Sequence, residues 1–305
     1  MEPIHVTGAT GYIGRRFVRA MAAAAPGSRI VAIVRDAAAV PAELRTVPGV
    51  EFVKADLGDA GTLAAPLEGC RTVVHLAAAT GKARRKEHFR VNADATAALL
   101  AAARTAGATA FLHVSTISAA FADRRHYPYA QSKLRAEELV RGAGVPFTIV
   151  RPTVVLGPGS AVLEGLSKLA LLPVTPLFGG GRAKLQPIDV ADVVAALVEI
   201  VVARRFRGET IDLGGPEVVT TRDLLARIRA LRGKGALRGL RFPLGLPRAL
   251  LAAVEPLLLP VLPLTAGQLC PFANDGTAAP SEFVSSRKRP LRGLDESLRE
   301  ALARG

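Results

Sequence analysis

The stretch VTGATGYIGRRFV, residues 6–18, decides the fold. Gly8, Gly11 and Gly14 follow a short β-branched run and precede a segment of helical length. Glycines at this spacing permit a tight turn that brings backbone N–H groups against a phosphate, and the N-terminus of the next helix favours negative charge. The stretch therefore predicts a strand, a pyrophosphate-binding turn and a helix, which together begin a nucleotide-binding domain.

Short β-branched runs alternate with alanine-rich segments through the first half of the chain. The predicted strands are IHV (4–6), RIVAIV (29–34), EFVKA (51–55), TVVHLAA (72–78), TAFLHVS (109–115) and PFTIVRP (146–152), with helices near 12–25, 37–46, 59–68 and 88–106. This alternation predicts βαβ units and an α/β fold, a doubly wound parallel sheet covered on both faces. Residues 1–155 are expected to form the dinucleotide-binding domain, completed by about 187–215, and residues 156–186 and 216–305 a smaller substrate-binding region.

Composition excludes several classes of protein. Half of the 305 residues are apolar and 22% are charged, which is typical of a globular chain. Cys70 and Cys270 form no CxxC motif, so we expect neither a disulfide framework nor a metal site. The N-terminus has no basic segment followed by an apolar run, so it does not resemble a signal peptide and we expect a cytoplasmic protein.

The segment ALLAAVEPLLLPVLPL, residues 249–264, is the most membrane-like part of the chain. Glu255 and three prolines interrupt it, and it is shorter than a spanning helix requires. We therefore expect it to line a pocket or to touch a membrane surface peripherally, and these two alternatives stay open.

The formal net charge of +14 requires a reason. Basic residues gather at 82–90, 203–207, 227–241 and 286–292. A nucleic-acid surface would interleave aromatic side chains for stacking, but the chain has no Trp and only three Tyr, so we expect no nucleic-acid partner. A solvated arginine-rich surface, attraction to an anionic cofactor or substrate, and contact with acidic lipid stay open.

The end of the second predicted strand distinguishes between two cofactors. NAD enzymes usually place a carboxylate there for the adenosine ribose, whereas this chain has Val34 followed by Arg35. An arginine can pair with a 2′-phosphate, so we favour NADP(H). Asp36 keeps NAD(H) open, because a shift of one residue in the register would restore the acid.

Seven motifs resemble those of the extended and atypical short-chain dehydrogenase/reductases in order and spacing. They are TGATGYIG, ADL (55–57), VVHLAA (73–78), HVSTIS (113–118), YAQSKLRAE (129–137), IVRPTVVLGPG (149–159) and PIDVADV (187–193). The resemblance runs from residue 4 to about 230. It is greatest to the branch that contains the NAD(P)H-binding accessory subunit of respiratory complex I, and it implies a Rossmann sheet.

The resemblance implies which residues bind the cofactor. The phosphate turn would contribute Gly8, Thr10, Gly11, Tyr12, Ile13 and Gly14. Arg35, Asp56 and Leu57 would lie at the adenosine end, Ala77 and Ala78 along the cofactor, and Lys133, Pro152, Thr153 and Val155 at the nicotinamide end. Asn92 matches a helix behind the active site, where a structural role is expected.

Hydride transfer at a carbon requires a proton to move at the attached oxygen. Tyr129 can move it if a nearby ammonium lowers its pKa, and Lys133 lies four residues on, one helical turn away. Alignment with the family places Thr116 beside the same substrate oxygen. A YxxxK pair also arises by chance, but this pair falls between the fifth and sixth strands, where the family has it. Tyr127 does not fit, because Gln131 follows it by four residues.

These residues predict an NAD(P)-dependent oxidoreductase that acts on a secondary alcohol or ketone. A nucleotide-sugar epimerase and a non-catalytic NADPH-binding assembly or sensor subunit remain as alternatives. Dehydration is not expected, because Ile117 and Ser118 stand where the dehydratases carry an acid pair. The Leu/Pro-rich segment 243–272 favours a small apolar or lipid-like substrate, and the sequence does not predict an oligomeric state.

Overall fold

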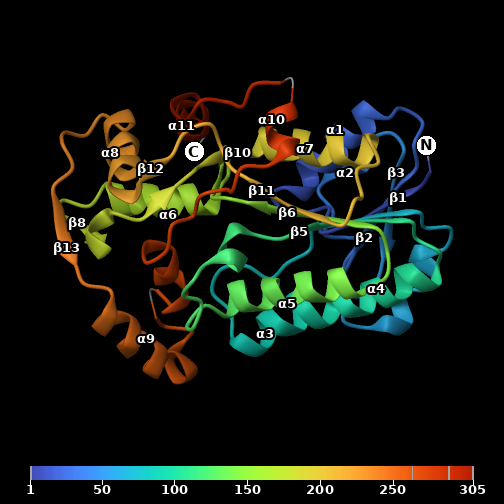
Figure 1. Ribbon diagram of the computed structural model, residues 1–305, viewed down its shortest axis with the longest axis horizontal. Coiled ribbons are helices and arrows are strands. Elements are labelled where there is room, and N and C mark those ends of the chain that lie inside the picture. The colour runs from blue at the N-terminus through green and yellow to red at the C-terminus, as the bar shows by residue number, and fades with distance from the viewer. Residues whose placement is uncertain (1, 263, 288, 304–305) are drawn as a thin grey trace.

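The protein is described here by a computed structural model that covers residues 2–262, 264–287 and 289–303. Its central sheet has seven parallel strands in the order β11-β6-β5-β4-β1-β2-β3 (Figure 1). They are β1 (Ile4–Thr7), β2 (Ile30–Val34), β3 (Val50–Lys54), β4 (Thr72–His75), β5 (Ala110–Val114), β6 (Phe147–Pro152) and β11 (Glu209–Leu213). The order reverses between β1 and β4, and ligands of such sheets bind beyond the carboxyl ends of the strands at that point. The predicted doubly wound sheet is confirmed.

Helices cover both faces of the sheet (Figure 1). One layer holds α1 (Gly14–Ala24) and α7 (Val190–Val202), and the other holds α4 (Ala95–Thr105) and α5 (Pro128–Gly142). A short α3 (Arg85–Phe89) and a π-helical turn (Arg90–Asp94) lead into α4. Two predicted helices are shorter than expected. The segment 37–46 is helical only in α2 (Ala42–Arg45), after Pro41, and the segment 59–68 forms two 3-10 turns, Ala60–Thr62 and Ala65–Leu67, with Gly61 and Pro66 inside them.

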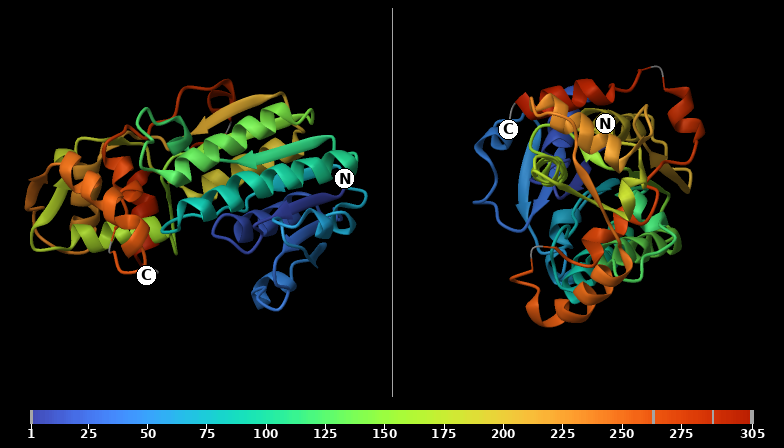
Figure 2. Two further views of the ribbon diagram at one scale, coloured as in Figure 1. Left: turned by 90° about the horizontal axis from the view of Figure 1, so that it is seen from below. Right: turned by 90° about the vertical axis from the view of Figure 1, so that its left-hand side faces the viewer.

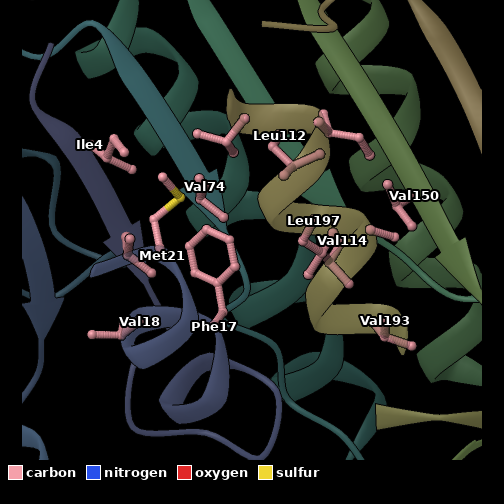
Figure 3. Packing of buried hydrophobic residues seen from close by; sticks show 14 of the residues in the cluster. Ile4, Phe17, Val18, Met21, Val74, Leu112, Val114, Val150, Val193 and Leu197 are labelled. Atoms are coloured by element: carbon pink, nitrogen blue, oxygen red, sulfur yellow. The ribbon is translucent and has the colours of Figure 1, made fainter. Parts of the chain in front are cut away.

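The main core lies between the sheet and the α1/α7 layer. Figure 3 shows Phe17 and Met21 of α1 and Leu197 of α7 pointing toward Val74 and Leu112 of the sheet, and these side chains are buried. On the opposite face Leu99, Phe111 and Ile149 are buried beneath the other layer. This burial on both faces accounts for the nearly continuous apolar runs of the strands.

Most of the remaining elements gather at one end of the sheet, whereas α10 (Glu282–Ser286) lies beside α7 (Figures 1 and 2). The elements at that end are β7 (Val155–Leu156), α6 (Ala161–Ala170), β8 (Thr175–Phe178), β9 (Lys184–Leu185), β10 (Ile188–Asp189), β12 (Val219–Thr220), α8 (Thr221–Leu231), β13 (Gly239–Phe242), α9 (Gly245–Leu258), the 3-10 helix η6 (Gly267–Phe272) and α11 (Leu294–Ala303). A core of their own, which includes Leu163, Leu224 and Leu298, holds α6, α8 and α11 together. Phe283 of α10 instead joins the core beneath α1 and α7. Within the described ranges, no helix has the length and apolarity that a membrane crossing requires.

Candidate functional site

The turn between β1 and α1 requires its glycines. Gly8 has φ +71°, and a Cβ there would lie 2.5 Å from the backbone nitrogen of Ala77, just beyond β4. A Cβ at Gly14 would overlap the carbonyl oxygen of Gly8, which also accepts the N–H of Gly11 at 3.0 Å. The turn is therefore packed directly against the chain beyond β4 at the point where the strand order reverses.

The same turn fits a pyrophosphate. Within the described ranges, the amide groups of Tyr12 and Ile13 donate no hydrogen bond to the protein, and no acidic residue lies in the first turn of α1. The guanidinium of Arg16 lies 4.5 Å from the centroid of the Tyr12 ring and donates to the carbonyl oxygens of Tyr12 and Pro158 at 2.8 and 2.7 Å. Free amides at a helix N-terminus flanked by arginine are suited to an anionic cofactor.

The end of β2 presents an arginine. Val34 is the last residue of the strand and is buried, and Arg35 follows it and is exposed. Across the described residues, the Arg35 side chain makes no hydrogen bond or ion pair, although it is near enough to lower the pKa of Glu87. The carboxylate of Asp36 accepts the N–H of Ala38 at 2.8 Å, so it is already engaged in a local turn.

Residues beyond β3 and β4 lie along the same edge of the sheet. Asp56 is exposed and accepts the N–H of Gly58 at 2.9 Å, and Leu57 beside it is half-buried. Ala77 and Ala78 directly follow the β4 contact with Gly8 and are half-buried. These residues stand where a cofactor that runs from the β2 end to the β6 end of the sheet would pass.

Asn92 fixes the segment beyond β4. Its amide oxygen accepts the N–H of Ala79 at 2.7 Å, and its amide nitrogen donates to the carbonyl of Ala79 and to Oγ of Ser132, both at 3.0 Å. Ser132 lies on α5, so one fully buried side chain ties the β4 loop to the helix that carries Tyr129. The contacts agree with the structural role expected of Asn92.

At the nicotinamide end, the predicted residues are less accessible. Pro152 ends β6 and is buried, and Val155 begins β7 and is half-buried. The backbone N–H of Thr153 donates to the carbonyl of Leu213 at 3.0 Å, and its hydroxyl donates to the carbonyl of Gln186. The Thr153 hydroxyl is thus used within the protein.

Tyr129 and Thr116 are brought together. Tyr129 is the second residue of α5, and Thr116 caps the 3-10 turn Ile117–Ala120 after β5, where its side chain accepts the N–H of Ser118. Burial raises the pKa of Tyr129 to about 12, although a hydrogen bond with Thr116 lowers it in part. The ring centroid of Tyr129 lies 5.7 Å from that of Tyr127 and 6.0 Å from that of His88.

Lys133 is held away from that pair. Its side chain is 1% exposed, and Nζ donates to the carbonyl of Val114 at 2.7 Å and lies 3.2 Å from Nε2 of His113. Burial lowers the pKa of Lys133 to about 7. The expected lowering of the Tyr129 pKa by Lys133 is absent, because the flexible side chain turns to strand β5 although the helix spacing puts both residues on one face.

One turn beyond Lys133, α5 carries a buried carboxylate, Glu137, that the sequence patterns did not indicate. Glu137 accepts the hydroxyl of Ser115 at 2.6 Å and both guanidinium donors of Arg151, at 2.8 and 2.5 Å. Burial raises its pKa, but the hydrogen bonds from Arg151 and Ser115 outweigh burial and lower it. The repeat of four residues from Tyr129 through Lys133 to Glu137 was the available signal.

Two strand histidines, His75 and His113, are buried and have polar partners within the protein. His75 lies between two threonines, with Nδ1 2.6 Å from Oγ1 of Thr7 and Nε2 2.9 Å from Oγ1 of Thr96. The Thr96 hydroxyl donates to the carbonyl of Asn92, so Nε2 of His75 carries the proton and Nδ1 accepts. Burial lowers the pKa of His75 to about 3, and burial likewise lowers the pKa of His113 well below its usual value.

An apolar hollow of about 360 Å³ lies at the far side of η6. Its lining residues are Phe178, Phe242, Pro247, Leu250, Leu251, Val254, Leu264 and Leu269. At the near side of η6, a Cβ on Gly267 would lie 3.0 Å from the ring of Tyr127, which in turn contacts Tyr129. The 3-10 helix η6 therefore lines the hollow through Leu269 and contacts the ring of Tyr127 through Gly267. No cluster of potential metal ligands occurs among the residues that the structure describes.

Comparison with known proteins gives matches in sequence and in structure. The model of the NAD dependent epimerase/dehydratase family matches residues 4–214. The chain is 38% identical over 199 residues to the ceramide reductase of Caulobacter vibrioides, a match that covers 64% of this chain and 59% of that protein. It is 30% identical over 225 residues to mitochondrial NADH dehydrogenase [ubiquinone] 1 alpha subcomplex subunit 9 of Arabidopsis thaliana, covering 72% of this chain and 55% of that protein.

The chain thus spans little more than half the length of these two relatives. Among solved structures, it is similar to DesIV, a dTDP-glucose 4,6-dehydratase from Streptomyces venezuelae with NAD and TYD bound. The TM-score is 0.76 at 22% identity, over 99% of this chain and 96% of that one. At that identity the similarity shows the fold alone.

Proposed function

The chain belongs to the NAD dependent epimerase/dehydratase family, and from this premise we propose that it is an NADP(H)-preferring oxidoreductase that interconverts a ketone and a secondary alcohol. The observation that carries the proposal is the pairing of the Tyr129 and Thr116 hydroxyls beyond β5, on the same edge of the sheet as the glycine turn. Two neighbouring hydroxyls can both donate hydrogen bonds to one carbonyl oxygen of a substrate, and one of them can protonate it.

Each residue has a distinct part in this proposal. Bound nicotinamide would supply the hydride for a ketone or accept it from an alcohol. Tyr129, with a pKa of about 12, is protonated at neutral pH and donates its proton to the substrate oxygen, while Thr116 holds that oxygen. Lys133 ties α5 to β5 through the carbonyl of Val114 and so helps to fix the position of Tyr129.

Arg35 supports the NADP(H) preference. It is the first residue beyond β2, it is exposed, and it forms no ion pair with any residue in the described ranges. Asp36, which would favour NAD(H), is engaged with the N–H of Ala38. A free guanidinium at this position offers charge-assisted hydrogen bonds to a 2′-phosphate.

The apolar hollow supports a substrate with an alkyl chain. Every lining residue that the structure describes is apolar, and η6, which lines the hollow through Leu269, also contacts Tyr127 through Gly267. We propose that the reacting carbonyl lies at Tyr129 and that the alkyl chain passes η6 into the hollow. The ceramide named for the relative from Caulobacter vibrioides is a lipid of this general kind. An apolar hollow is unsuited to a sugar, which weighs against epimerisation.

A panel of alkyl ketones of increasing chain length, assayed with NADPH and NADH in parallel, tests the proposed function. The proposal predicts NADPH oxidation that increases in kcat/KM with chain length. If the protein binds NADPH in a fluorescence titration but oxidises it with no ketone of the panel, the result would instead support the second candidate.

That second candidate is a subunit that holds NADPH without turnover. The similarity to the subunit from Arabidopsis thaliana favours it, as do the high pKa of Tyr129 and the contacts of Lys133 with β5. The presence of Thr116 and Tyr129 together weighs against it, because binding alone does not require both hydroxyls.

A further inference from the structure

Helix α9 turns an apolar face to solvent. Leu246, Leu250, Val254, Leu257, Leu258 and Val261 recur every three or four residues, so they form one stripe along the helix and the turn after it. Leu257 is 86% exposed, Val261 76% and Leu246 70%. The opposite side of the segment is covered, with Leu259 buried and Arg248 bound to Asp123 at 2.6 Å. Among the described residues, the outer part of the stripe, Leu246, Leu257 and Val261, is therefore left to solvent.

The segment that carries the stripe is basic. Directly before α9, from Lys234 to Gly245, the sequence contains no acidic residue and carries Lys234, Arg238 and Arg241. Arg238 and Arg241 are exposed at β13, directly before α9, and neither pairs with a carboxylate in the described part of the chain. Glu255 is the one acid within α9, and it accepts the N–H of Ala266 at 3.1 Å.

A second basic segment reaches the end of the helix. Nζ of Lys82 donates to the carbonyls of Pro260 and Leu262 at 3.1 and 2.6 Å, which ties the exposed run Lys82 to Lys86 to the turn after α9. The stripe is therefore flanked by positive charge near both of its ends. Figures 1 and 2 show α9 at the outer edge of the molecule, away from the central sheet.

The stripe is continuous with the apolar hollow. Leu250 and Val254 belong to both, so the hollow opens beside the exposed face of α9.

We propose that the α9 stripe and its basic flanks dock on the surface of an anionic lipid bilayer, with α9 lying in the plane of the interface. Apolar side chains on one face of a helix and Lys/Arg around it are the features that bind such surfaces. A second copy of the chain is a poorer occupant, because a two-fold contact would bring the basic flanks of the two copies toward each other. The proposed docking involves surface residues alone, so vesicle binding can be tested whether or not the proposed reaction occurs.

Sedimentation with vesicles tests the docking. The full chain is mixed with vesicles of phosphatidylcholine alone, and of phosphatidylcholine with a quarter phosphatidylglycerol, at low and high salt. We expect binding to the anionic vesicles at least tenfold tighter than to the neutral ones, and its loss at high salt. Equal binding to both vesicles, or no binding to either, overturns the proposal.

Two pairs of variants locate the surface. Leu257→Gln with Val261→Gln should weaken vesicle binding at least tenfold, whereas Val162→Gln with Val218→Gln, which alters half-exposed residues elsewhere, should not. Arg238→Gln with Arg241→Gln should weaken binding roughly tenfold or more, and Arg104→Gln with Arg207→Gln, exposed residues away from α9, should have a smaller effect.

Thermal unfolding confirms that each variant is folded, and light scattering reports the oligomeric state. Equal loss of binding in the control pairs overturns the assignment of the surface. A dimer that Leu257→Gln with Val261→Gln dissociates, without vesicle binding by the parent chain, overturns the bilayer in favour of self-association.

Discussion

Nζ of Lys133 lies 3.2 Å from Nε2 of His113, and both side chains are buried between α5 and strand β5. The lysine also donates to the carbonyl of Val114 at 2.7 Å. A cationic group is therefore enclosed where burial opposes its charge, and its pKa falls to about 7. Lys133 thus changes charge near neutral pH, one turn of α5 beyond Tyr129.

The first prediction concerns stability against pH. The unfolded lysine has a pKa near 10.5, so from about pH 7 upward it retains a proton that the folded protein releases. The free energy of unfolding should rise with pH between 7 and 8.5, by up to about 1.4 kcal/mol per pH unit, and Lys133→Met should remove this rise. Urea unfolding at several pH values measures it. Lys168→Met, at an exposed lysine of α6, is the control, and parallel curves for wild type and Lys133→Met would contradict the account.

The second prediction concerns the buried ion pair behind the site. Glu137→Gln leaves Arg151 without its bidentate carboxylate, so it should cost about 3 kcal/mol in the free energy of unfolding. Glu138→Gln breaks an exposed pair with Arg135 and should cost less than about 1 kcal/mol. Chemical denaturation of the two variants measures both values. Equal costs would show that Glu137 does not anchor α5 to β6.

The third prediction concerns the glycine turn. Gly8→Ala forces a Cβ against the backbone of Ala77, so NADPH binding should be lost and stability should fall. Gly27→Ala is the matched control, because Gly27 has φ +81° but no atom within 4 Å of the added Cβ. It should cost only about 1 kcal/mol through backbone strain and leave cofactor binding unchanged. Fluorescence titration with NADPH separates the two, and full NADPH binding by Gly8→Ala would contradict the turn as the cofactor cradle.

The fourth prediction concerns cofactor choice. Arg35→Ser removes the guanidinium proposed for the 2′-phosphate, so the Kd for NADPH should rise roughly tenfold or more while that for NADH stays within about twofold. Arg104→Ser, which removes an exposed arginine from the end of α4, should change neither value. If Arg35→Ser raised the Kd for NADPH and the Kd for NADH equally, Arg35 would contact the adenosine that both cofactors share and not the 2′-phosphate.

The fold could be predicted from the sequence because its signals are local. The glycine turn, with the β-branched runs around it, identified the strands of the parallel sheet, and β2 ends at Val34 as the cofactor argument required. The helices near 37–46 and 59–68 were overestimated, since proline and glycine restrict them to single turns. Short helices depend on tertiary packing, which residue spacing does not report.

The positions of the predicted site residues along one edge of the sheet were easier to predict than the directions of their side chains. Spacing placed Tyr129 and Lys133 on one helix face, but the direction of a long lysine side chain depends on the carbonyl and the histidine that it meets on β5. Glu137 has a partner that is distant in sequence, Arg151, and this kept it out of the sequence analysis. Which face of α9 meets solvent likewise follows from tertiary packing, since its apolar residues alone fit a buried helix equally well.

Tyr129 is the residue on which the proposed chemistry depends. The measurement is the turnover of NADPH by wild type, Tyr129→Phe and Tyr127→Phe on the most active ketone of the panel. Both substitutions remove one phenolic hydroxyl from neighbouring rings 5.7 Å apart, so their structural effects are similar. The account predicts that Tyr129→Phe lowers kcat roughly 100-fold or more with NADPH binding intact, and that Tyr127→Phe retains most of the activity. Turnover by Tyr129→Phe at the level of Tyr127→Phe would contradict it.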